Sequence, residues 1–427
     1  MSKKFFAVFI VITVILCPLI CGCSEGEEEI EFFVTEDTAS IDYSKYEGVT
    51  LNVYNWGEYI SDGSDGSVDI NAEFTKLTGI KINYTNFTSN EDMYNKIVNG
   101  GVSYDIIIPS DYMIEKLIKE ELVLELNFDN IPNYKYIAPE YKNLFFDPQN
   151  AYSVPYSVGM VGLIYNTSIV TEKLDSWGAL WDEKYDGQIL MFNNPRDAFG
   201  IAQFLLKEEG NDINSLSEQD WINAKNKLSE QKPFVKAYVM DEIFNKMESG
   251  AAAMAPYYAG DYFSMYENNP DLAFVYPKEG TNIFVDSVCI PASTKNKEAA
   301  ELYINYLMDP NVALQNAYMI CYASPNTAVV ENEEYLEYLD ELHPEAYDIL
   351  YMDMSEYYGG IDVRGYYFRD LPDETLNTMN SLWNSLKIES TEESSTDFVY
   401  YFCAVVITFL LVMFIINKIK KYKREHV

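Results

Sequence analysis

The stretch from Leu51 to Tyr59 combines side chains that could bind a cation. Leu51 and Val53 alternate with polar residues, which predicts a strand with one buried face, and Trp56, Glu58 and Tyr59 follow its end. In an open α/β sheet, ligands bind beyond the carboxyl ends of the strands. An aromatic face attracts a positive charge by about 0.5 to 2 kcal/mol, and a neighbouring carboxylate adds a charge-assisted hydrogen bond. This stretch alone fits a cation site and ordinary rim packing of Trp56 and Tyr59 equally well.

The same combination of a ring or polar group with a carboxylate recurs after other strand-like runs. The further instances are Ser110 with Asp111 and Tyr112, Asn194 with Asp197, Tyr258 with Asp261, and Phe284 with Asp286. Their recurrence at corresponding points of a βα series predicts one cleft lined with rings and acids, suited to an extended polycation. Asn194 before Pro195 is also a good helix N-cap, and Asp197 then falls in the first turn, so capping alone can explain both residues.

The composition limits the classes of function. The formal net charge is −37, which makes nucleic acid a poor partner and cationic solutes good partners, although most of these carboxylates fit a solvated acidic surface. His343 and His426 are the only histidines, which argues against a histidine-ligated metal and against histidine catalysis. The sequence has no P-loop, dinucleotide fingerprint, zinc spacing or nucleophile elbow. We therefore predict no enzyme, no cofactor and no metal site.

Strand-like and helix-like stretches alternate from Val49 onward. Helical spacing of apolar residues at 70–77 is followed by alternation at 80–84, and a second block with the same rhythm begins near Val161. Predicted strands include 104–108, 162–166, 189–192 and 287–290; predicted helices include 198–205, 300–307, 331–342 and 377–386. This rhythm predicts an α/β fold with helices on both faces of a sheet, and 427 residues can bury two cores.

Several segments jointly resemble one family, the bacterial spermidine/putrescine-binding proteins of polyamine ABC importers. They are YNWGEY (54–59), FTKLTGIKI (74–82), SYDIIIPSDY (103–112), VPYSVGMVGLIYN (154–166), SWGALWDEKYDGQILM (176–191), YPKEGTNIFVDSVCIP (276–291) and CYASPN (321–326). The likeness runs from about Leu51 to about Leu386. It implies a two-lobed, periplasmic-binding-protein-like (type II) fold with a hinge, whose lobes close on the ligand. Lobe 1 would comprise 49–158 and 286–336, and lobe 2 would comprise 159–285 and 337–388.

The resemblance also implies a ligand site. Rings would come from Trp56, Tyr59, Tyr112, Tyr258, Phe284 and Tyr322, a polar contact from Ser110, and ammonium-binding acids from Asp197 and Asp286. Asn194 stands where the family has a further acid, and Tyr258 and Phe284 stand where tryptophan is more frequent, which weakens the case for tight spermidine preference. A late polar contact of the family near Phe368 has no convincing match, and Arg369 in the cleft would repel a polyamine. We expect Glu58 and Asp111 to be solvated.

The predicted function is capture of a polyamine by a monomeric extracellular protein that delivers it to an ABC permease and its ATPase. One alternative keeps the fold and changes the ligand to another cationic solute or to ferric ion, for which Tyr257 and Tyr258 would supply oxygen ligands. Another alternative is a sensory ectodomain, although the tail after Asn417 is short for signalling.

Both ends of the chain indicate membrane attachment. Residues 1–23 read as an export signal, and the tetrad 20–23 resembles a lipoprotein box with Cys23 as the lipidated residue. Residues 24–48 are predicted to be an acidic tether, and 389–397 a linker. Residues 398–416 are apolar and uncharged, which predicts a transmembrane helix, with the basic tail 417–427 in the cytoplasm and the bulk outside. In that compartment Cys289 and Cys321 could pair or remain free thiols.

Overall fold

A computed structural model describes residues 32–351, 357–358, 361–362, 365–388 and 408. The described part contains a ten-stranded sheet of order β2-β1-β3-β9-β4-β7-β5-β6, with β12 beside β9 and β8 beside β4. Its strands are β1 (Thr50–Trp56), β2 (Lys81–Phe87), β3 (Ile106–Ile107), β4 (Ser153–Asn166), β5 (Ile189–Phe192), β6 (Val235–Val239), β7 (Met254–Tyr258), β8 (Leu272–Val275), β9 (Thr281–Cys289) and β12 (Gly365–Tyr367). A separate antiparallel pair consists of β10 (Tyr357–Tyr358) and β11 (Ile361–Asp362).

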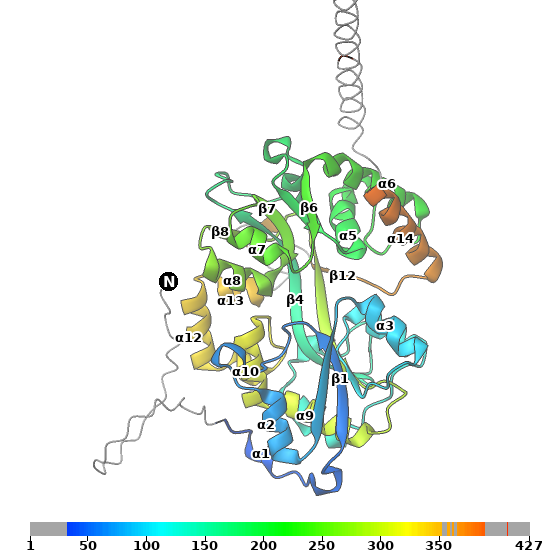
Figure 1. Cartoon of the computed structure of the whole chain (residues 1–427), viewed down its shortest axis with the longest axis vertical. Helices are drawn as coiled ribbons and strands as arrows, with labels where there is room; N and C mark the ends of the chain where they lie inside the picture. The colour runs from blue at the N-terminus through cyan, green and yellow to red at the C-terminus, as the bar shows by residue number, and fades with distance from the viewer. Residues whose placement is uncertain (1–31, 352–356, 359–360, 363–364, 389–407, 409–427) are drawn as a thin grey trace, which may run out of the picture. The chain divides into compact units, whose positions relative to one another are not determined.

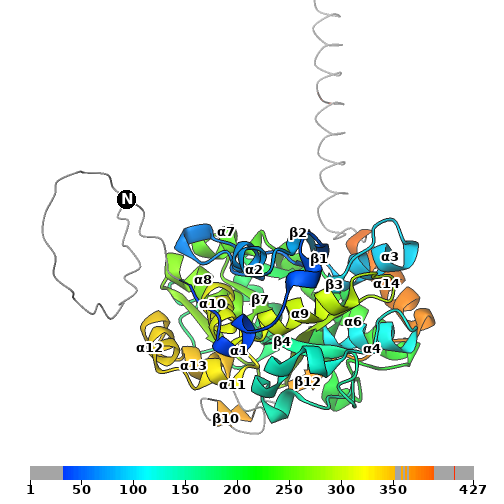
Figure 2. The same ribbon diagram turned by 90° about the horizontal axis from the view of Figure 1, so that it is seen from below.

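Helices connect and cover these strands (Figure 1). They are α1 (Glu36–Ala39), α2 (Ile70–Thr78), α3 (Asn90–Asn99), α4 (Asp111–Lys119), α5 (Pro195–Leu205), α6 (Glu218–Gln231), α7 (Ile243–Glu248), α8 (Ala259–Asn268), α9 (Lys297–Leu307), α10 (Pro310–Ile320), α11 (Thr327–Val330), α12 (Glu333–Leu342), α13 (Ala346–Leu350) and α14 (Asp373–Ile388). Helix α2 shows why these boundaries form: the Asp69 side chain accepts a hydrogen bond from the Ala72 amide, and Gly79 ends the helix at φ +73°. Helices α11, α12 and α13 lie together (Figure 2).

The long strand β4 joins two groups of elements. Its first part, 153–160, pairs antiparallel with β9, and its second part, 161–166, pairs with β7 and β8. All 14 residues of β4 are buried. We call β1 to β3 with α2 to α4 and α9 the first half, and β5 to β8 with α5 to α8 and α14 the second half. Strands β4 and β9 are common to both (Figure 1).

The predicted α/β fold is confirmed, while the hinge and the lobe boundaries remain predictions. The strand predicted at 162–166 is the end of the much longer β4, and the strand predicted at 287–290 begins earlier, at Thr281. Asp286 therefore lies inside β9, opposite Ser157 of β4, rather than before the strand. Both strands are buried along nearly their whole length, so no alternation of apolar and polar residues marks where they start.

The segment 33–47, predicted as part of the tether, packs on the first half. Asp309, which is fully buried, accepts hydrogen bonds from the Thr35 amide at 3.0 Å and from the hydroxyls of Thr35 and Thr38 at 2.5 and 2.6 Å. Tyr43 is buried as well. Polar contacts with distant residues, together with the buried Tyr43, hold this segment, and such contacts leave no hydrophobic period in the sequence.

Replacing Asp309 tests this attachment. Asp309→Ala removes the acceptor of four hydrogen bonds, three from Thr35 and Thr38 and one from the Asn311 amide at the start of α10. We expect the free energy of unfolding to fall by at least about 3 kcal/mol, since hydrogen bonds to charged groups contribute about 1.5 to 3 kcal/mol. Urea unfolding measures the change. The control is Asp37→Ala, which breaks the exposed pair with Lys135 and should change stability far less, because exposed ion pairs contribute little. Equal shifts for the two variants would contradict the assignment.

The predicted attachments at the two ends mostly fall outside the described residues. This applies to the export signal 1–23 with Cys23, the linker 389–397, the tail 417–427 and, apart from Thr408, the segment 398–416. Among the residues that are described, no helix is both long enough and apolar enough to cross a membrane. Cys289 and Cys321 are both buried free thiols, which answers the question of whether they pair.

Candidate functional site

Asp286 is the central carboxyl group of the candidate site. It is 3% exposed, and its Oδ2 accepts a hydrogen bond of 2.8 Å from the Tyr59 hydroxyl. Its Oδ1 is buried without a hydrogen-bond partner. Burial raises the pKa of Asp286 to about 6, and the hydroxyls of Ser110 and Tyr59 act against this rise. A buried carboxyl group with one free oxygen can accept a hydrogen bond from an ammonium group.

The end of β1 fixes the position of Tyr59. Glu58 adopts a left-handed conformation at φ +50°, which turns the chain directly after the strand. The Tyr59 carbonyl oxygen then accepts hydrogen bonds from Asn55 Nδ2 at 3.2 Å and from the Tyr156 hydroxyl at 2.8 Å. The Tyr59 ring meets the edge of the Tyr322 ring, with centroids 5.5 Å apart. The two predicted rings are therefore neighbours.

Tyr322 forms the second tyrosine–carboxyl pair. Its hydroxyl donates to Asp261 Oδ2 at 3.0 Å. Burial raises the pKa of Asp261 to about 7, Tyr322 lowers it, and the charges of Asp241 and Glu58 raise it further. Gly260 is required here because a Cβ atom at this position would lie 2.3 Å from the Tyr322 ring. The absence of a side chain thus lets the ring approach the start of α8.

Tyr258 and Asp197 form the third pair. The Tyr258 hydroxyl donates to Asp197 Oδ2 at 3.0 Å. Burial raises the pKa of Asp197 to about 7, while Tyr258 lowers it; the charge of Glu91 raises it and that of Arg196 lowers it. The Phe284 ring lies 5.6 Å from Tyr258 and 6.2 Å from Tyr322 and joins this pair to the others.

These seven residues form one connected group, which we call the tyrosine–carboxyl cluster: Tyr59, Asp197, Tyr258, Asp261, Phe284, Asp286 and Tyr322. Its residues come from both halves of the fold and from strand β9, which the two halves share. Within the described part of the chain, none of the three acids forms an ion pair with a lysine or arginine. Two buried carboxyl groups, Asp197 and Asp286, and the partly buried Asp261, none of them ion-paired to a described residue, are suited to a ligand that brings its own positive charges.

Asn90 joins two other predicted residues, Ser110 and Tyr112, to each other. Asn90 Nδ2 donates to Ser110 Oγ at 3.1 Å and to the Tyr112 hydroxyl at 3.2 Å. The Tyr112 hydroxyl donates in turn to Glu91 at 3.0 Å. Ser110, Tyr112 and Glu91 thus belong to one polar group at the start of α4. The Ser110 hydroxyl also lowers the pKa of Asp286.

The last two predicted residues have other contacts. Trp56 packs on Phe87 with ring centroids 4.5 Å apart, and no ring contact or hydrogen bond joins it to the cluster within the described part. Its Nε1 is buried without a partner. Asn194 caps α5, because its Oδ1 accepts a hydrogen bond of 2.9 Å from the Arg196 amide. The capping interpretation of Asn194 is thus correct, whereas Asp197 belongs to the cluster.

The expected solvation of Asp111 is wrong. Asp111 is 1% exposed, and its Oδ2 accepts a hydrogen bond of 3.2 Å from the Val285 amide of β9. The sequence could not show that this first residue of α4 ties the helix to a strand 174 residues away. Glu58 is exposed as expected. Arg369 does not present a free charge, because its guanidinium pairs with Glu115.

Asp261 is a site residue that our selection from the sequence left out. Asp197 and Asp261 are each the third residue of a helix that directly follows a strand of the sheet, α5 after β5 and α8 after β7. This shared position could have identified Asp261 from the sequence. Strands β5 and β7 are parallel, so the first turns of the helices that follow them lie at the same edge of the sheet.

Comparisons with known proteins fit this architecture. Residues 69–339 match the family model described as bacterial extracellular solute-binding protein. The chain belongs to this family. Among its relatives, the spermidine/putrescine-binding periplasmic protein of Escherichia coli is 34% identical over 281 residues, which cover 65% of this chain and 78% of the relative. A putrescine-binding periplasmic protein of the same organism is 30% identical over 299 residues, covering 65% and 78%.

Solved structures of related proteins have a similar fold. A putative spermidine/putrescine ABC transporter protein from Listeria monocytogenes superposes with a TM-score of 0.70 at 35% identity, covering 79% of this chain and 99% of that one. The substrate-binding protein of a spermidine/putrescine ABC transporter from Streptococcus pneumoniae gives 0.64 at 32% identity, covering 80% and 99%. The family confirms the predicted periplasmic-binding-protein-like fold and the prediction of a binding protein rather than an enzyme.

Proposed function

We propose that this solute-binding protein captures a polyamine of the spermidine/putrescine class in the tyrosine–carboxyl cluster and delivers it to an ABC importer. The observation that carries the proposal is a group of three acids, two buried and one (Asp261) partly buried, whose only described hydrogen-bond donors are hydroxyl and not basic groups. A polyamine would supply the missing positive charges, and its methylene segments would pack on the rings of Tyr322 and Phe284. The names of the relatives support the same ligand class.

In this proposal the two halves act as the lobes of a trap. Asp286 and Phe284 lie on β9, which is common to both halves, while Tyr59 comes from the first half and Tyr258 with Asp261 from the second. A ligand held between them would favour the closed arrangement, and β4 and β9 would form the hinge. The permease and ATPase of the importer are the proposed partners, and the lipid on Cys23 and the segment 398–416 the proposed anchors.

The polyamine proposal is preferred over ferric ion for a structural reason. Tyr257, one of the two tyrosines considered as iron ligands, is 3% exposed and stacks on Phe192 with centroids 5.6 Å apart, so its ring belongs to the core of the second half. Burial raises the pKa of Tyr258 and of Tyr322, which disfavours tyrosinate. The described residues also contain no group of three His, Cys, Asp or Glu side chains arranged for a metal.

Calorimetric titration of the full chain tests the proposal. Spermidine or putrescine should bind with one-to-one stoichiometry, since the cluster is a single group, and a neutral sugar should give no heat. Addition of ferric ion should produce no purple tyrosinate colour. Absence of heat with both polyamines would remove this function, and colour with tight iron binding would favour the other ligand.

A further inference from the structure

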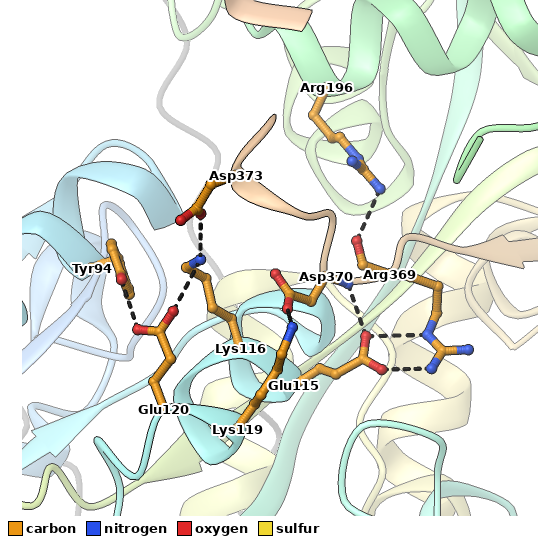
Figure 3. Close-up of polar contacts among 9 residues, drawn as sticks. All are labelled: Tyr94, Glu115, Lys116, Lys119, Glu120, Arg196, Arg369, Asp370 and Asp373. Atoms are coloured by element: carbon orange, nitrogen blue, oxygen red, sulfur yellow. Dashed lines mark hydrogen bonds and ion pairs between the residues drawn. The ribbon is translucent and has the colours of Figure 1, made fainter. Parts of the chain in front are cut away.

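A group of ion pairs joins α4 to the segment that leads into α14 (Figure 3). Glu115 accepts hydrogen bonds from Arg369 Nε at 3.1 Å and Nη2 at 2.5 Å, and from the Asp370 amide at 2.8 Å. Lys119 pairs with Asp370 at 3.0 Å, and Lys116 pairs with Asp373 at 3.2 Å. We call these residues the α4 latch: Glu115, Lys116, Lys119, Arg369, Asp370 and Asp373.

The two sides of the α4 latch belong to different halves of the fold. Helix α4 is held to α3, because Glu120 pairs with Lys116 at 3.1 Å and accepts a hydrogen bond of 2.7 Å from Tyr94. The other side is held to the second half. The Arg369 amide donates to Asn214 Oδ1 at 2.8 Å. Arg196 Nη2 of α5 donates to the Arg369 carbonyl at 3.1 Å (Figure 3). The ion pairs therefore cross from one half to the other.

The α4 latch differs from the isolated surface pairs of this protein. One side chain of each pair is largely buried: Lys116 is 9%, Asp370 5% and Glu115 22% exposed, while their partners Asp373, Lys119 and Arg369 are exposed. Arg369 binds Glu115 through two nitrogen atoms. Exposed single pairs contribute little to stability, whereas networks and bidentate arginine pairs contribute more. The same helix begins beside the cluster with Ser110 and Tyr112. The α4 latch thus holds the second part of a helix, whose first turn lies near the cluster, against the opposite half.

We propose that the α4 latch stabilises the arrangement in which the two halves meet around the tyrosine–carboxyl cluster, and that it thereby slows the release of bound solute. This inference rests on the function proposed above. Separating the halves requires the three ion pairs of the α4 latch to break. The free energy that these pairs contribute therefore raises the population of the closed state. A solute that binds the closed state then dissociates more slowly when the pairs are intact.

The test uses the full chain and three variants: Glu115→Gln, Arg369→Gln and the double variant. We expect each single change to raise the spermidine Kd by about 3- to 10-fold through a faster dissociation rate in stopped-flow experiments. The spermidine Kd of the double variant should be no higher than that of the single variant with the higher Kd, because both single changes remove the same ion pair. The control is Glu73→Gln, which breaks the Lys76–Glu73 pair within α2 and should leave the Kd within twofold.

Hydrogen exchange of the ligand-free chain provides a readout that does not depend on polyamine binding. In Glu115→Gln, the peptide containing Tyr258 to Asp261 should exchange faster as the halves separate, while buried β5 should exchange as in the unchanged protein. An unchanged Kd and unchanged exchange would overturn the latch, and faster exchange in β5 would show general destabilisation and overturn it too. If the unchanged protein bound no polyamine, the proposed function would be wrong. The exchange comparison would still show whether the α4 latch holds the two halves together.

Discussion

Asp286→Asn should reduce spermidine affinity by roughly 30- to 4,000-fold. Removing one partner of a buried, hydrogen-bonded charge pair costs about 2 to 5 kcal/mol, and each 1.4 kcal/mol is a factor of ten in Kd. Asparagine keeps the shape of the side chain and an acceptor for the Tyr59 hydroxyl, so the loss isolates the negative charge. Calorimetry of the two proteins at pH 8, where Asp286 is ionised, measures the effect.

The stability of the same variant distinguishes loss of binding from loss of folding. Because burial raises the pKa of Asp286 to about 6, the ligand-free fold disfavours the charge that the ligand requires. Asp286→Asn should therefore unfold at the same temperature as the unchanged protein or a higher one. The control Asp271→Asn removes an exposed acid and should change affinity less than twofold. Unchanged affinity of Asp286→Asn, or a clearly lower unfolding temperature, would contradict the role given to this residue.

The sequence predicted the kinds of side chain in the site better than their partners. Rings and acids after strand-like runs led to Tyr59, Tyr258, Asp197 and Asp286, which the structure brings into one group. Which ring meets which acid could not be predicted, since Tyr59 and Asp286 are 227 positions apart and meet only because β1, β3, β9 and β4 are adjacent in the sheet. Local patterns predict elements, and the strand order decides their contacts.

Trp56 shows the limit of local reasoning most clearly. It follows a strand beside a carboxylate, and that pattern gave no sign that its ring packs on Phe87 at the end of the parallel neighbour β2; its role as a ligand contact remains a prediction. The helix cap at Asn194 and the bounds of β5 depend on adjacent residues only and were predicted correctly. The packing of 33–47 depends on Asp309, far along the chain, and was not.

Binding should weaken as the pH falls from about 8 to 5. Burial raises the pKa of Asp286 to about 6 and those of Asp197 and Asp261 to about 7, so these groups take up protons within this range. Alkylammonium groups, like that of lysine, titrate well above it and stay charged. A polyamine favours the carboxylates, and its binding must release protons. Each acid that becomes protonated can therefore weaken the affinity by up to about tenfold per pH unit below its pKa.

The ligand-free protein should show the opposite pH dependence. The three folded-state pKa values lie above the ordinary value of 3.8, so the folded chain holds more protons than the unfolded chain between about pH 4 and 7. Their contribution to the free energy of unfolding is complete below pH 4 and is lost as the pH rises to 7.

Proton release on binding can be measured by titrating spermidine at pH 5 to 8 in two buffers of different ionisation enthalpy. The heats of binding should depend on the buffer, and Asp197→Asn should release fewer protons. A Kd that is constant from pH 5 to 8, with heats independent of buffer, would mean that the three acids do not contact the ligand. Burial raises the pKa values of these carboxyl groups and a bound cation lowers them, so binding to them must release protons.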